Sequence, residues 1–320
     1  MASNLIPYKH LFPSKFKRLL KHNPYVEHLE KLTKNRVYRR NQKIVLVQGL
    51  KVIKDIRDHG VPIKSIGVTA ELDPVNEDAI KYPANEVLRN PDLFPAENYY
   101  LATIDVTRKI LGTEARPAGH ELWAEVPFPQ HPFPEKKQLD RVLVLDKVND
   151  PISLGMLVQT ARALGWRAGW LNSGTVDLYH DKAVRGSLAA TLWWPTKTGQ
   201  WDDLRQFLDE YELTPMLADV ERKNGVEELS TREEGKEGEP HGLKIWNWPA
   251  EVERKMPERV ALVVSSLHPN LWKDEIPNDF LRVSVPTVDA NRLSSPIAGG
   301  LLMYEINRIL AAKEKGPKAV

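Results

Sequence analysis

The sequence contains no cysteine, and this absence narrows the chemistry that the chain can perform. Without cysteine it can form no disulfide and can offer a metal no thiolate, which fits a reducing compartment. Its nine histidines show no His-Glu-x-x-His or comparable spacing, and isolated residues such as His180 and His268 are typical of surface positions. We therefore expect no metal site and a chemistry of oxygen and nitrogen groups.

Long hydrophobic runs and glycine-rich phosphate loops are also missing. The longest apolar run, around residues 297–302, contains glycines and is far shorter than the roughly 20 residues that span a bilayer. No Gly-x-Gly-x-x-Gly follows a strand pattern, and no Gly-x-x-x-x-Gly-Lys occurs. We therefore expect no membrane role. The missing loops also argue against an enzyme that uses a nicotinamide cofactor or a nucleoside triphosphate.

The composition is that of an ordinary globular protein, and the N-terminal segment is rich in basic residues. At 320 residues and 42% hydrophobic content the chain can bury one large core or two ordinary ones, and two domains are favoured. The net charge of +2 conceals an excess in residues 1–43, where eleven Lys or Arg accompany only Glu27 and Glu30. Such a segment would attract a phosphate backbone.

Two alternatives for this basic segment remain open, a solvated tail and an organelle transit segment. No acidic residue precedes Glu27, as in transit segments, but serine is sparse and Arg18 is the only early arginine. From the transit interpretation we expect a mitochondrial location, otherwise a cytoplasmic or nuclear one, and not secretion.

The first half of the sequence alternates strand and helix patterns. A β-branched run at 44–47 precedes Gly49, and apolar residues then recur at helical spacing up to Gly60. A helix pattern at 106–111 and further strand patterns complete a small α/β unit, with the strands expected at 65–69, 99–103 and 121–126. Proline then occupies four of the eight positions from 127 to 134, which no sheet interior or helix accommodates. We place the domain boundary there, in a proline-rich linker at 129–140.

The second half favours a parallel sheet covered by helices on both faces, because strand and helix patterns alternate in it. Residues 221–243 interrupt the alternation; they are dense in Glu, Lys, Arg and Gly and predict a charged, solvated insertion. A long terminal helix closes the chain. The other expected elements are strands at 141–146, 167–171, 214–218, 260–264 and 281–285, and helices at 154–164, 179–192 and 201–211.

The segment from Asp150 to Gly155 reads as a turn from a strand into a helix. The Asp-Pro step can turn the chain, and Ser153 could cap the helix by accepting from its free amides. The helix is then expected to end at Gly165, since glycine readily adopts positive φ. Physical reasoning alone therefore gives a turn and a capped helix here.

Several segments together resemble one known family. Residues 150–165 are similar to the first motif of the SpoU (TrmH-type) RNA ribose 2′-O-methyltransferases of the SPOUT superfamily, roughly Asp-Pro-x-Asn-x-Gly followed by Arg-Thr-Ala and a glycine. Val285-Pro286, Leu293 and residues 298–306 resemble the third motif and the closing helix. Weaker similarity lies at 183–190, at Leu262-Val263-Val264 before the second motif, and at 39–69 and 117–119 in what looks like the substrate-binding domain. The resemblance covers about residues 36–312.

This resemblance implies an α/β protein whose C-terminal SPOUT domain, at 141–313, has a parallel sheet and a trefoil knot. It implies a smaller L30e-like α/β domain at 36–128 that holds RNA, preceded by the basic segment 1–35. The implied cofactor is S-adenosylmethionine, bound at Val285, Pro286 and Leu293. RNA, either rRNA or tRNA, is the implied partner, and the candidate RNA-binding residues are Arg36, Arg39 and Arg40.

A homodimer through the C-terminal helix is implied as well. Pro296 suits the first turn of that helix, Ser294 or Ser295 could cap it, and Ala298-Gly299-Gly300 would let another backbone come close. The alternative is that this helix packs inside its own domain.

Several polar positions depart from the family pattern. The asparagine of the first motif corresponds to Ser153, and the arginine expected to activate the ribose hydroxyl corresponds to Gln159, which cannot supply a positive charge. The Gly-Asn-Glu of the second motif falls at 265–267, where Leu267 replaces the carboxylate, and the Ser-Leu-Asn of the third falls at 292–294. Arg162 and Arg292 are candidates to stand in for the missing arginine, although a phosphate contact or a surface charge is the alternative for each.

Two functions of different classes follow. The first is S-adenosylmethionine-dependent 2′-O-ribose methylation of rRNA or tRNA, with an activity that the substitutions weaken or abolish. The second is a catalytically inactive RNA-binding scaffold or ribosome assembly factor. Backbone contacts at Val285 and Leu293 would survive the side-chain changes, so cofactor binding is expected to suffer less than catalysis.

Overall fold

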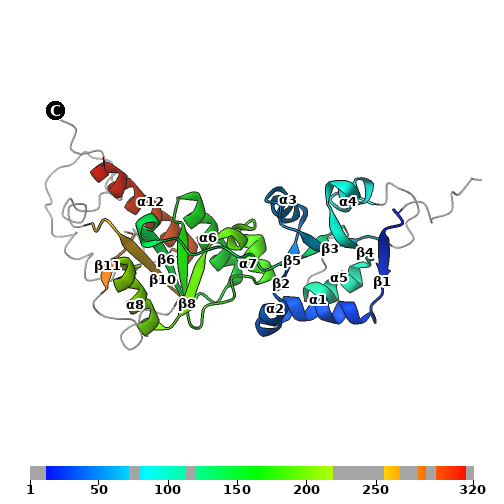
Figure 1. The fold of residues 1–320 in the computed structure, drawn as a ribbon, viewed down its shortest axis with the longest axis horizontal. Helices are drawn as coiled ribbons and strands as arrows, with labels where there is room; N and C mark the ends of the chain where they lie inside the picture. The colour runs from blue at the N-terminus through cyan, green and yellow to red at the C-terminus, as the bar shows by residue number, and fades with distance from the viewer. Residues whose placement is uncertain are drawn as a thin grey trace, which may run out of the picture. The chain divides into compact units, whose positions relative to one another are not determined.

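The chain folds into two units that interleave along the sequence. The computed structural model describes residues 12–71, 80–112, 120–218, 256–266, 280–285 and 293–314. The first unit comprises Met1–Gln130 and Asp177–Trp193, and the second comprises His131–Val176 and Trp194–Val320 (Figure 1). The first boundary falls between Gln130 and His131, within the stretch in which four of eight residues are proline.

The first unit is built on a five-stranded mixed sheet. Its strand order is β1-β4-β3-β5-β2. The inner strand β3 pairs in parallel with β4 and antiparallel with β5, while β1 pairs in parallel with β4 and β2 antiparallel with β5. The strands are β1 (Phe16–Leu19), β2 (Ile44–Gln48), β3 (Ile63–Thr69), β4 (Ala96–Ala102) and β5 (Leu122–Pro127).

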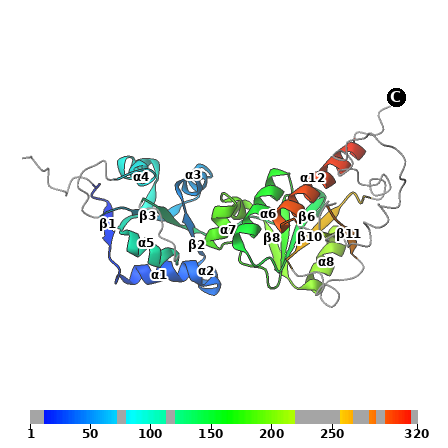
Figure 2. The same ribbon diagram turned by 180° about the vertical axis from the view of Figure 1, so that it is seen from behind.

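Helices cover both faces of this sheet, as Figures 1 and 2 show. One face packs against α3 (Leu50–Asp58), α4 (Ala84–Arg89) and α7 (Asp181–Gly186). The other packs against α1 (Pro24–Lys34) and α5 (Ile104–Leu111), with α2 (Arg36–Gln42) following α1 directly. Short 3-10 turns lie at Pro91–Leu93 and Ala190–Trp193.

Capping residues fix the start of α1 and the junction of α1 with α2. The side chain of Asn23 accepts from the Tyr25 amide, and Pro24 begins α1, where a missing N–H costs nothing. Asn35 ends α1, and its side chain accepts from the Tyr38 amide to begin α2. The two helices therefore meet at a residue that belongs to both caps.

Gly67 sets the contact between β3 and β5. A Cβ at this position would lie 1.9 Å from Cε2 of Trp123, so the buried indole occupies the space where a side chain would be. The sheet therefore accepts a tryptophan at β5 only because its neighbour on β3 has no side chain.

The second unit is built on a six-stranded sheet in which every described strand pair is parallel. The order is β11-β9-β10-β6-β7-β8. Buried residues make up all of β7 and all but one residue of β6 and of β10, as in sheets covered on both faces. The strands are β6 (Arg141–Asp146), β7 (Ala168–Asn172), β8 (Thr196–Gly199), β9 (Thr214–Ala218), β10 (Val260–Ser265) and β11 (Leu281–Val283).

Among the described residues, three helices cover this sheet. On one face α8 (Trp201–Tyr211) packs through Phe207 and Tyr211, and on the other lie α6 (Pro151–Ala163) and α12 (Ser295–Glu314). The approach of α12 to α6 is close, since a Cβ at Gly299 would lie 2.7 Å from Cδ2 of Leu157. Gly299 and Gly300, where the sequence analysis expects the backbone of a second chain to come close, therefore face α6 of the same unit. Within the described ranges, no helix is long and apolar enough to cross a membrane.

Several segments fold differently from what the sequence predicts. The sequence predicts a separate basic segment at 1–35, but Phe16–Leu19 form β1 and Pro24–Lys34 form α1 inside the first unit. The helix packs there because the apolar Val26, Leu29 and Leu32 recur on one of its faces. The helix expected at 179–192 is broken after α7, where Leu188 and Ala189 have φ of 49° and 66°. Residues 177–193 also belong to the first unit rather than to the domain at 141–313.

The first turn of α6 is capped by a different residue from the one that the sequence predicts. Asp150, not Ser153, caps α6: its side chain accepts from the Ser153 amide. Gly165 follows that helix with φ of 81°, as predicted. The predicted insertion at 221–243 and the segment 117–119 lie outside the described residues.

Candidate functional site

A polar cluster lies where three adjacent parallel strands of the second unit end. Asp146 ends β6, Asn172 ends the neighbouring β7, and Ser265 ends β10 on the other side. The Asp146 carboxylate accepts from Asn172 Nδ2 at 3.1 Å and from Ser265 Oγ at 2.8 Å. Asn172 Oδ1 in turn accepts from Trp170 Nε1 at 2.8 Å. The carboxyl ends of strands in open α/β sheets are the usual place for a ligand, so this edge is the candidate site.

Burial dominates the electrostatics of this cluster. Asp146 is 1% exposed, and burial raises its pKa, while the hydrogen bonds from Ser265 and Asn172 and the nearby Lys147 oppose the rise. The main-chain oxygen of Asp146 also accepts from the Ser266 amide at 3.1 Å. Asp146 therefore holds both the side chain of Ser265 and the backbone of Ser266, the residues at which β10 ends.

The start of α6 adds a second polar contact within the same unit. Asp150 Oδ2 accepts from the Ser153 amide at 2.7 Å and from Ser153 Oγ at 2.6 Å. Ser153 is thereby tied to its own helix terminus. Further along α6, Gln159 is half-buried and Arg162 is exposed in the last turn.

Of the predicted cofactor residues, Val285 and Leu293 are described, and both lie in the same unit. Val285 is half-buried just after β11, and Leu293 is 38% exposed just before α12. Pro286 and the candidate catalytic residue Arg292 lie outside the described residues. The structure thus places β11, the start of α12 and the Asp146 cluster in one unit and leaves the loops between them undescribed.

The three arginines predicted to bind RNA have different environments. Arg36 and Arg40 are exposed on α2, but Arg39 is only 3% exposed. The Arg39 guanidinium donates to Asp177 Oδ2 at 3.0 and 2.7 Å and to the carbonyl oxygens of Leu32 and Thr33, both at 2.7 Å. Arg36 Nε lies 3.8 Å from Asp177 Oδ1. Arg39 therefore has a structural role, and Arg36 and Arg40 are the two that present charge to solvent.

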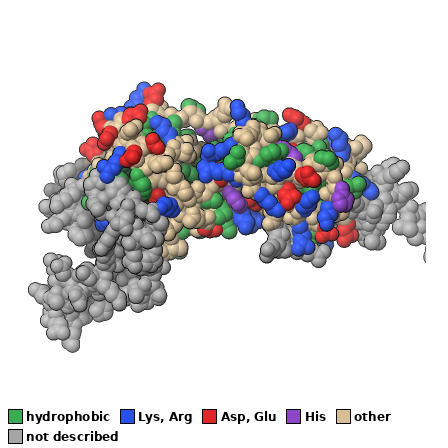
Figure 3. Space-filling model, turned by 90° about the horizontal axis from the view of Figure 1, so that it is seen from below, with side chains coloured by type: hydrophobic (Ala, Val, Ile, Leu, Met, Phe, Trp, Pro, Cys, Tyr) green, Lys and Arg blue, Asp and Glu red, His purple; other side chains and the backbone are tan. Residues whose placement is uncertain are grey.

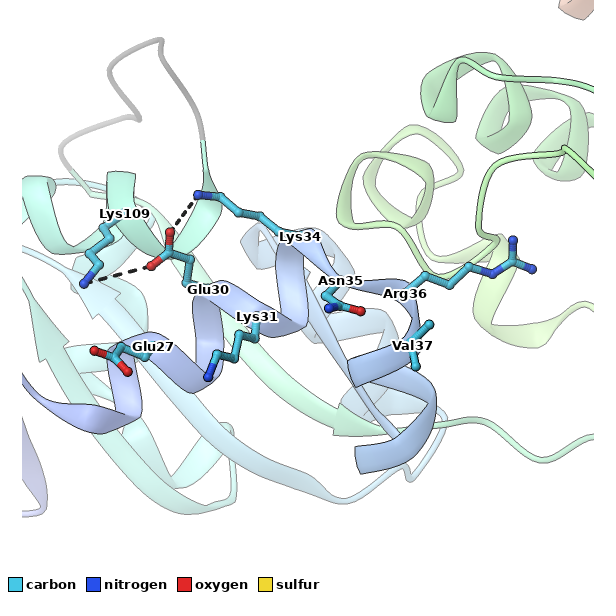
Figure 4. A pocket seen from close by; sticks show the side chains of 8 residues that line it. All are labelled: Glu27, Glu30, Lys31, Lys34, Asn35, Arg36, Val37 and Lys109. Atoms are coloured by element: carbon cyan, nitrogen blue, oxygen red, sulfur yellow. Dashed lines mark hydrogen bonds and ion pairs between the residues drawn. The ribbon is translucent and has the colours of Figure 1, made fainter.

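A cavity of about 610 Å³ opens beside Arg36 on the first unit (Figure 4). Lys34 and Lys109 point toward Glu30 from two sides, and Arg36 extends away from them at the other end. The residues that line the cavity come from α1, from the α1–α2 junction and from α5. They are Glu27, Glu30, Lys31, Lys34, Asn35, Arg36, Val37 and Lys109.

Under α1, the first unit contains a buried polar network. Glu125 is fully buried and accepts from Tyr25 and from Ser65 Oγ at 2.5 Å, while its other oxygen lies 2.8 Å from His28 Nε2. Burial raises the pKa of Glu125, but the hydrogen bonds from His28, Ser65 and Tyr25 outweigh burial, and the net pKa is lowered. Every polar atom of the carboxylate is engaged inside the unit, so the network stabilises the fold.

Sequence reasoning missed Asp146, Asn172 and Asp177. For the first two a signal existed, because each polar residue ends a strand pattern of a parallel sheet, where side chains converge. Asp177 gave no such signal, since its partner Arg39 is 138 residues away. In the ranges that the structure describes, no group of three or more His, Asp or Glu side chains is placed to hold a metal ion.

The fold of the chain is that of the SpoU/TrmH-type RNA 2′-O-ribose methyltransferases. No protein-family model matches the sequence, and no curated protein matches it. Solved structures match it over nearly the whole chain at low identity.

Three of these solved structures illustrate the likeness. The AdoMet complex of the SpoU methyltransferase AviRb from Streptomyces viridochromogenes has a TM-score of 0.63 at 17% identity, covering 92% of this chain and 100% of its own. The AdoMet-bound rRNA methyltransferase from Sinorhizobium meliloti has 0.60 at 18%, covering 92% and 99%. An RNA 2′-O ribose methyltransferase has 0.61 at 20%, covering 92% and 100%.

Proposed function

We propose that this protein binds S-adenosylmethionine and methylates a ribose 2′-hydroxyl of rRNA or tRNA. The observation that carries this proposal is the fold match, because it spans more than nine tenths of the chain and includes two AdoMet-bound enzymes. A match of this extent includes most of both units.

The residues at the candidate site suit such a cofactor. The hydroxyls of Ser265 and the exposed Ser266 supply hydrogen-bonding groups at the end of β10, and Val285 and the exposed part of Leu293 supply apolar surface. When bound, the cofactor supplies a methyl group on a positively charged sulfur. Backbone amides and carbonyls beside Val285 and Leu293 would hold it, and these contacts do not depend on side-chain identity.

The side chains contribute orientation more than proton transfer. Both oxygens of Asp146 are engaged, so this carboxylate fixes Ser265 and the loop that begins at Ser266. Gln159 on α6 can orient a group through its amide but cannot stabilise an alkoxide by charge. Arg162 or Arg292 would stabilise the developing alkoxide by its positive charge, and the proton of the ribose hydroxyl would pass to water.

A trefoil knot and a homodimer belong to this proposal. The knot would involve the loops after β10 and β11, which are only partly described. For the dimer, α12 presents Ile297 and Tyr304, 52% and 61% exposed, on one face, and α6 presents Ile152 and Met156, each 43% exposed. These residues recur at helical spacing on two helices that pack together, and such an exposed apolar face is typical of a subunit interface.

A second function, an inactive RNA-binding scaffold, is favoured by one observation. At the described motif positions Ser153 is tied to Asp150 and Gln159 is neutral, so neither supplies the positive charge expected beside the hydroxyl. The same fold without turnover would retain RNA binding.

Two measurements test the proposal and separate these functions. Calorimetric titration with S-adenosylmethionine should give saturable heat, and the cofactor should raise the temperature of thermal unfolding. If neither effect is seen at saturating ligand, the methyltransferase function is refuted. Transfer of tritiated methyl groups to total rRNA and tRNA should then give 2′-O-methylated nucleotides, lost in Arg292→Ala. Cofactor binding without any transfer would establish the inactive scaffold instead.

A further inference from the structure

We infer that Trp170 is a positioning residue for the proposed cofactor site. Its indole N–H fixes the amide of Asn172 and, through Asn172 and Asp146, the end of β10. The inference rests on the proposed function for the identity of the cofactor. The geometry that carries it does not, because every contact joins described residues of the second unit. Neither Trp170 nor Asn172 lies in a segment that resembles a SpoU motif.

The contacts lie at the level where four adjacent strands end. Ser265 pairs with Asp146 across β10 and β6, and Asn172 pairs with Gly199 across β7 and β8. Asp146 and Asn172 complete the row, since Asn172 Nδ2 donates to Asp146 Oδ1 at 3.1 Å. Trp170 precedes Asn172 by two residues of the same strand, so both side chains point to the same face of the sheet. A continuous line of side-chain contacts therefore runs from Trp170 to Ser265.

The polarity of these groups allows one orientation of the Asn172 amide. An indole N–H can only donate, so it requires the amide oxygen, and Trp170 Nε1 lies 2.8 Å from Asn172 Oδ1. The ionised carboxylate of Asp146 can only accept, so it requires the amide nitrogen. A flipped amide would set oxygen against oxygen and N–H against N–H, and both hydrogen bonds would be lost. The indole thereby determines that Asn172 donates to Asp146.

Burial makes these bonds hard to replace. Asp146, Asn172 and Trp170 are 1%, 3% and 4% exposed, whereas the face drawn in Figure 3 carries Lys, Arg, Asp and Glu side chains across its surface. A buried polar group that loses its partner bears the full cost of its desolvation. Without the indole N–H, the Asn172 oxygen would be unsatisfied, and the amide would no longer be held in its orientation.

The indole is itself held in place. It stacks on Phe207 of α8, with ring centroids 5.1 Å apart and an interplanar angle of 29°. It also fills the space beside Gly199, where a Cβ would lie 2.7 Å from Trp170 Cζ2. Lys197, the partner of Trp170 on β8, places its ammonium 5.2 Å from the Phe207 ring centroid. The direction of the indole N–H is therefore set by packing before any cofactor binds.

The test compares Trp170→Phe with Trp166→Phe. Trp166 is the matched control: it is a buried indole of the same unit whose N–H donates to Asn307 Oδ1 at 3.1 Å, but it precedes β7, at the opposite end from Asn172. Both variants keep an aromatic ring and lose one N–H, so both should lower the midpoint of urea unfolding. Trp170→Phe should also weaken binding of S-adenosylmethionine about fivefold or more in calorimetric titration, and Trp166→Phe should not.

Two further readouts separate positioning from packing. Trp170→Phe combined with Asn172→Ala should weaken cofactor binding no more than Asn172→Ala alone, because Trp170 acts through that amide. Hydrogen exchange of the Ser266 amide, which donates to the main-chain oxygen of Asp146 at 3.1 Å, should become faster in Trp170→Phe and stay unchanged in Trp166→Phe. If Trp170→Phe does not fold, Asn172→Ala takes its place in both comparisons with Trp166→Phe.

Each outcome decides the inference. Equal losses of cofactor affinity in the two tryptophan variants, additive losses in the double variant, or unchanged Ser266 exchange in Trp170→Phe would overturn the positioning role and leave the methyltransferase intact. If the wild-type protein binds no S-adenosylmethionine, the proposed function fails, and hydrogen exchange alone then decides whether Trp170 positions the end of β10.

Discussion

The guanidinium of Arg39 donates twice to a single carboxylate oxygen, Oδ2 of Asp177, through Nε at 3.0 Å and Nη2 at 2.7 Å. Both side chains are buried, and the remaining donors of Arg39 hold the end of α1. The pair therefore joins α1, α2 and the segment that begins at Asp177 inside the first unit. Arg185 on α7 adds a weaker contact to Gln48 at 3.4 Å.

Arg39→Ala should destabilise the protein by about 3 to 5 kcal/mol, because it leaves the Asp177 carboxylate buried without its cation. Asp177→Asn should cost less, since the amide still offers an oxygen to the guanidinium. Urea unfolding measures both, and the double variant gives the coupling energy. A loss for Arg39→Ala no larger than that of the exposed Lys51→Ala, within about 0.5 kcal/mol, would contradict this role.

The Glu125 network should make stability depend on acid pH. The folded pKa of Glu125 is lowered, so its contribution is fully present above the unfolded pKa and is lost as pH falls through the folded value. Glu125→Gln removes that contribution at neutral pH, and the gap between wild type and variant should shrink below about pH 4. Chemical denaturation at several pH values measures the gap; a gap that stays constant on acidification would argue against an ionised Glu125.

Asp146 should behave in the opposite sense. Its folded pKa is raised, so the stability that it contributes is fully present below the unfolded pKa and is lost as pH rises through the folded pKa. Ser265→Ala removes a donor to the carboxylate and should cost about 1 to 3 kcal/mol, more at higher pH where the carboxylate is ionised.

The control for this site is Ser266→Ala, which keeps the amide that donates to Asp146. Denaturation of both variants at mildly acidic and mildly alkaline pH distinguishes them. Equal effects of the two substitutions would show that the Ser265 hydroxyl does not matter, and S-adenosylmethionine titration of each then reports whether the cluster positions the cofactor loop.

The apolar face of α12 should determine oligomeric state. Ile297→Lys with Tyr304→Lys places two charges on the exposed face and should convert a dimer to a monomer with little change in the unfolding of the unit. Light scattering coupled to gel filtration measures the mass. Leu93→Lys, at a position 58% exposed in the first unit, is the control and should leave the mass unchanged. A wild-type monomer would refute the dimer directly.

The sequence predicted the second unit well because its patterns are local. Strands such as β6 and β10 are continuous apolar runs, and the predicted helix at 201–211 coincides with α8. It failed where long-range contacts decide. Residues 177–193 join the first unit through Asp177, Val184 and Leu192, and no periodicity in the segment indicates a partner so distant in sequence.

The candidate site was predictable only in part for the same reason. A resemblance in spacing located β11 and the start of α12, but the contact between Asp146 and Ser265 joins residues 119 apart and became visible only once strand order was known. Likewise Arg39 looked like Arg36 and Arg40 in sequence. Only burial distinguishes a guanidinium that neutralises a helix end from one that faces solvent.

The interleaving of the two units limits how this protein can be taken apart. The chain passes between units after Gln130, after Val176 and after Trp193, so the first unit is not a contiguous stretch of sequence. A fragment that stops at Gln130 would lack Asp177, so the buried guanidinium of Arg39 would have no carboxylate partner. A fragment that starts at His131 would contain residues 177–193 without the sheet that they cover. Expression trials, limited proteolysis and domain swaps should therefore treat residues 1–193 as the smallest piece that contains a complete first unit.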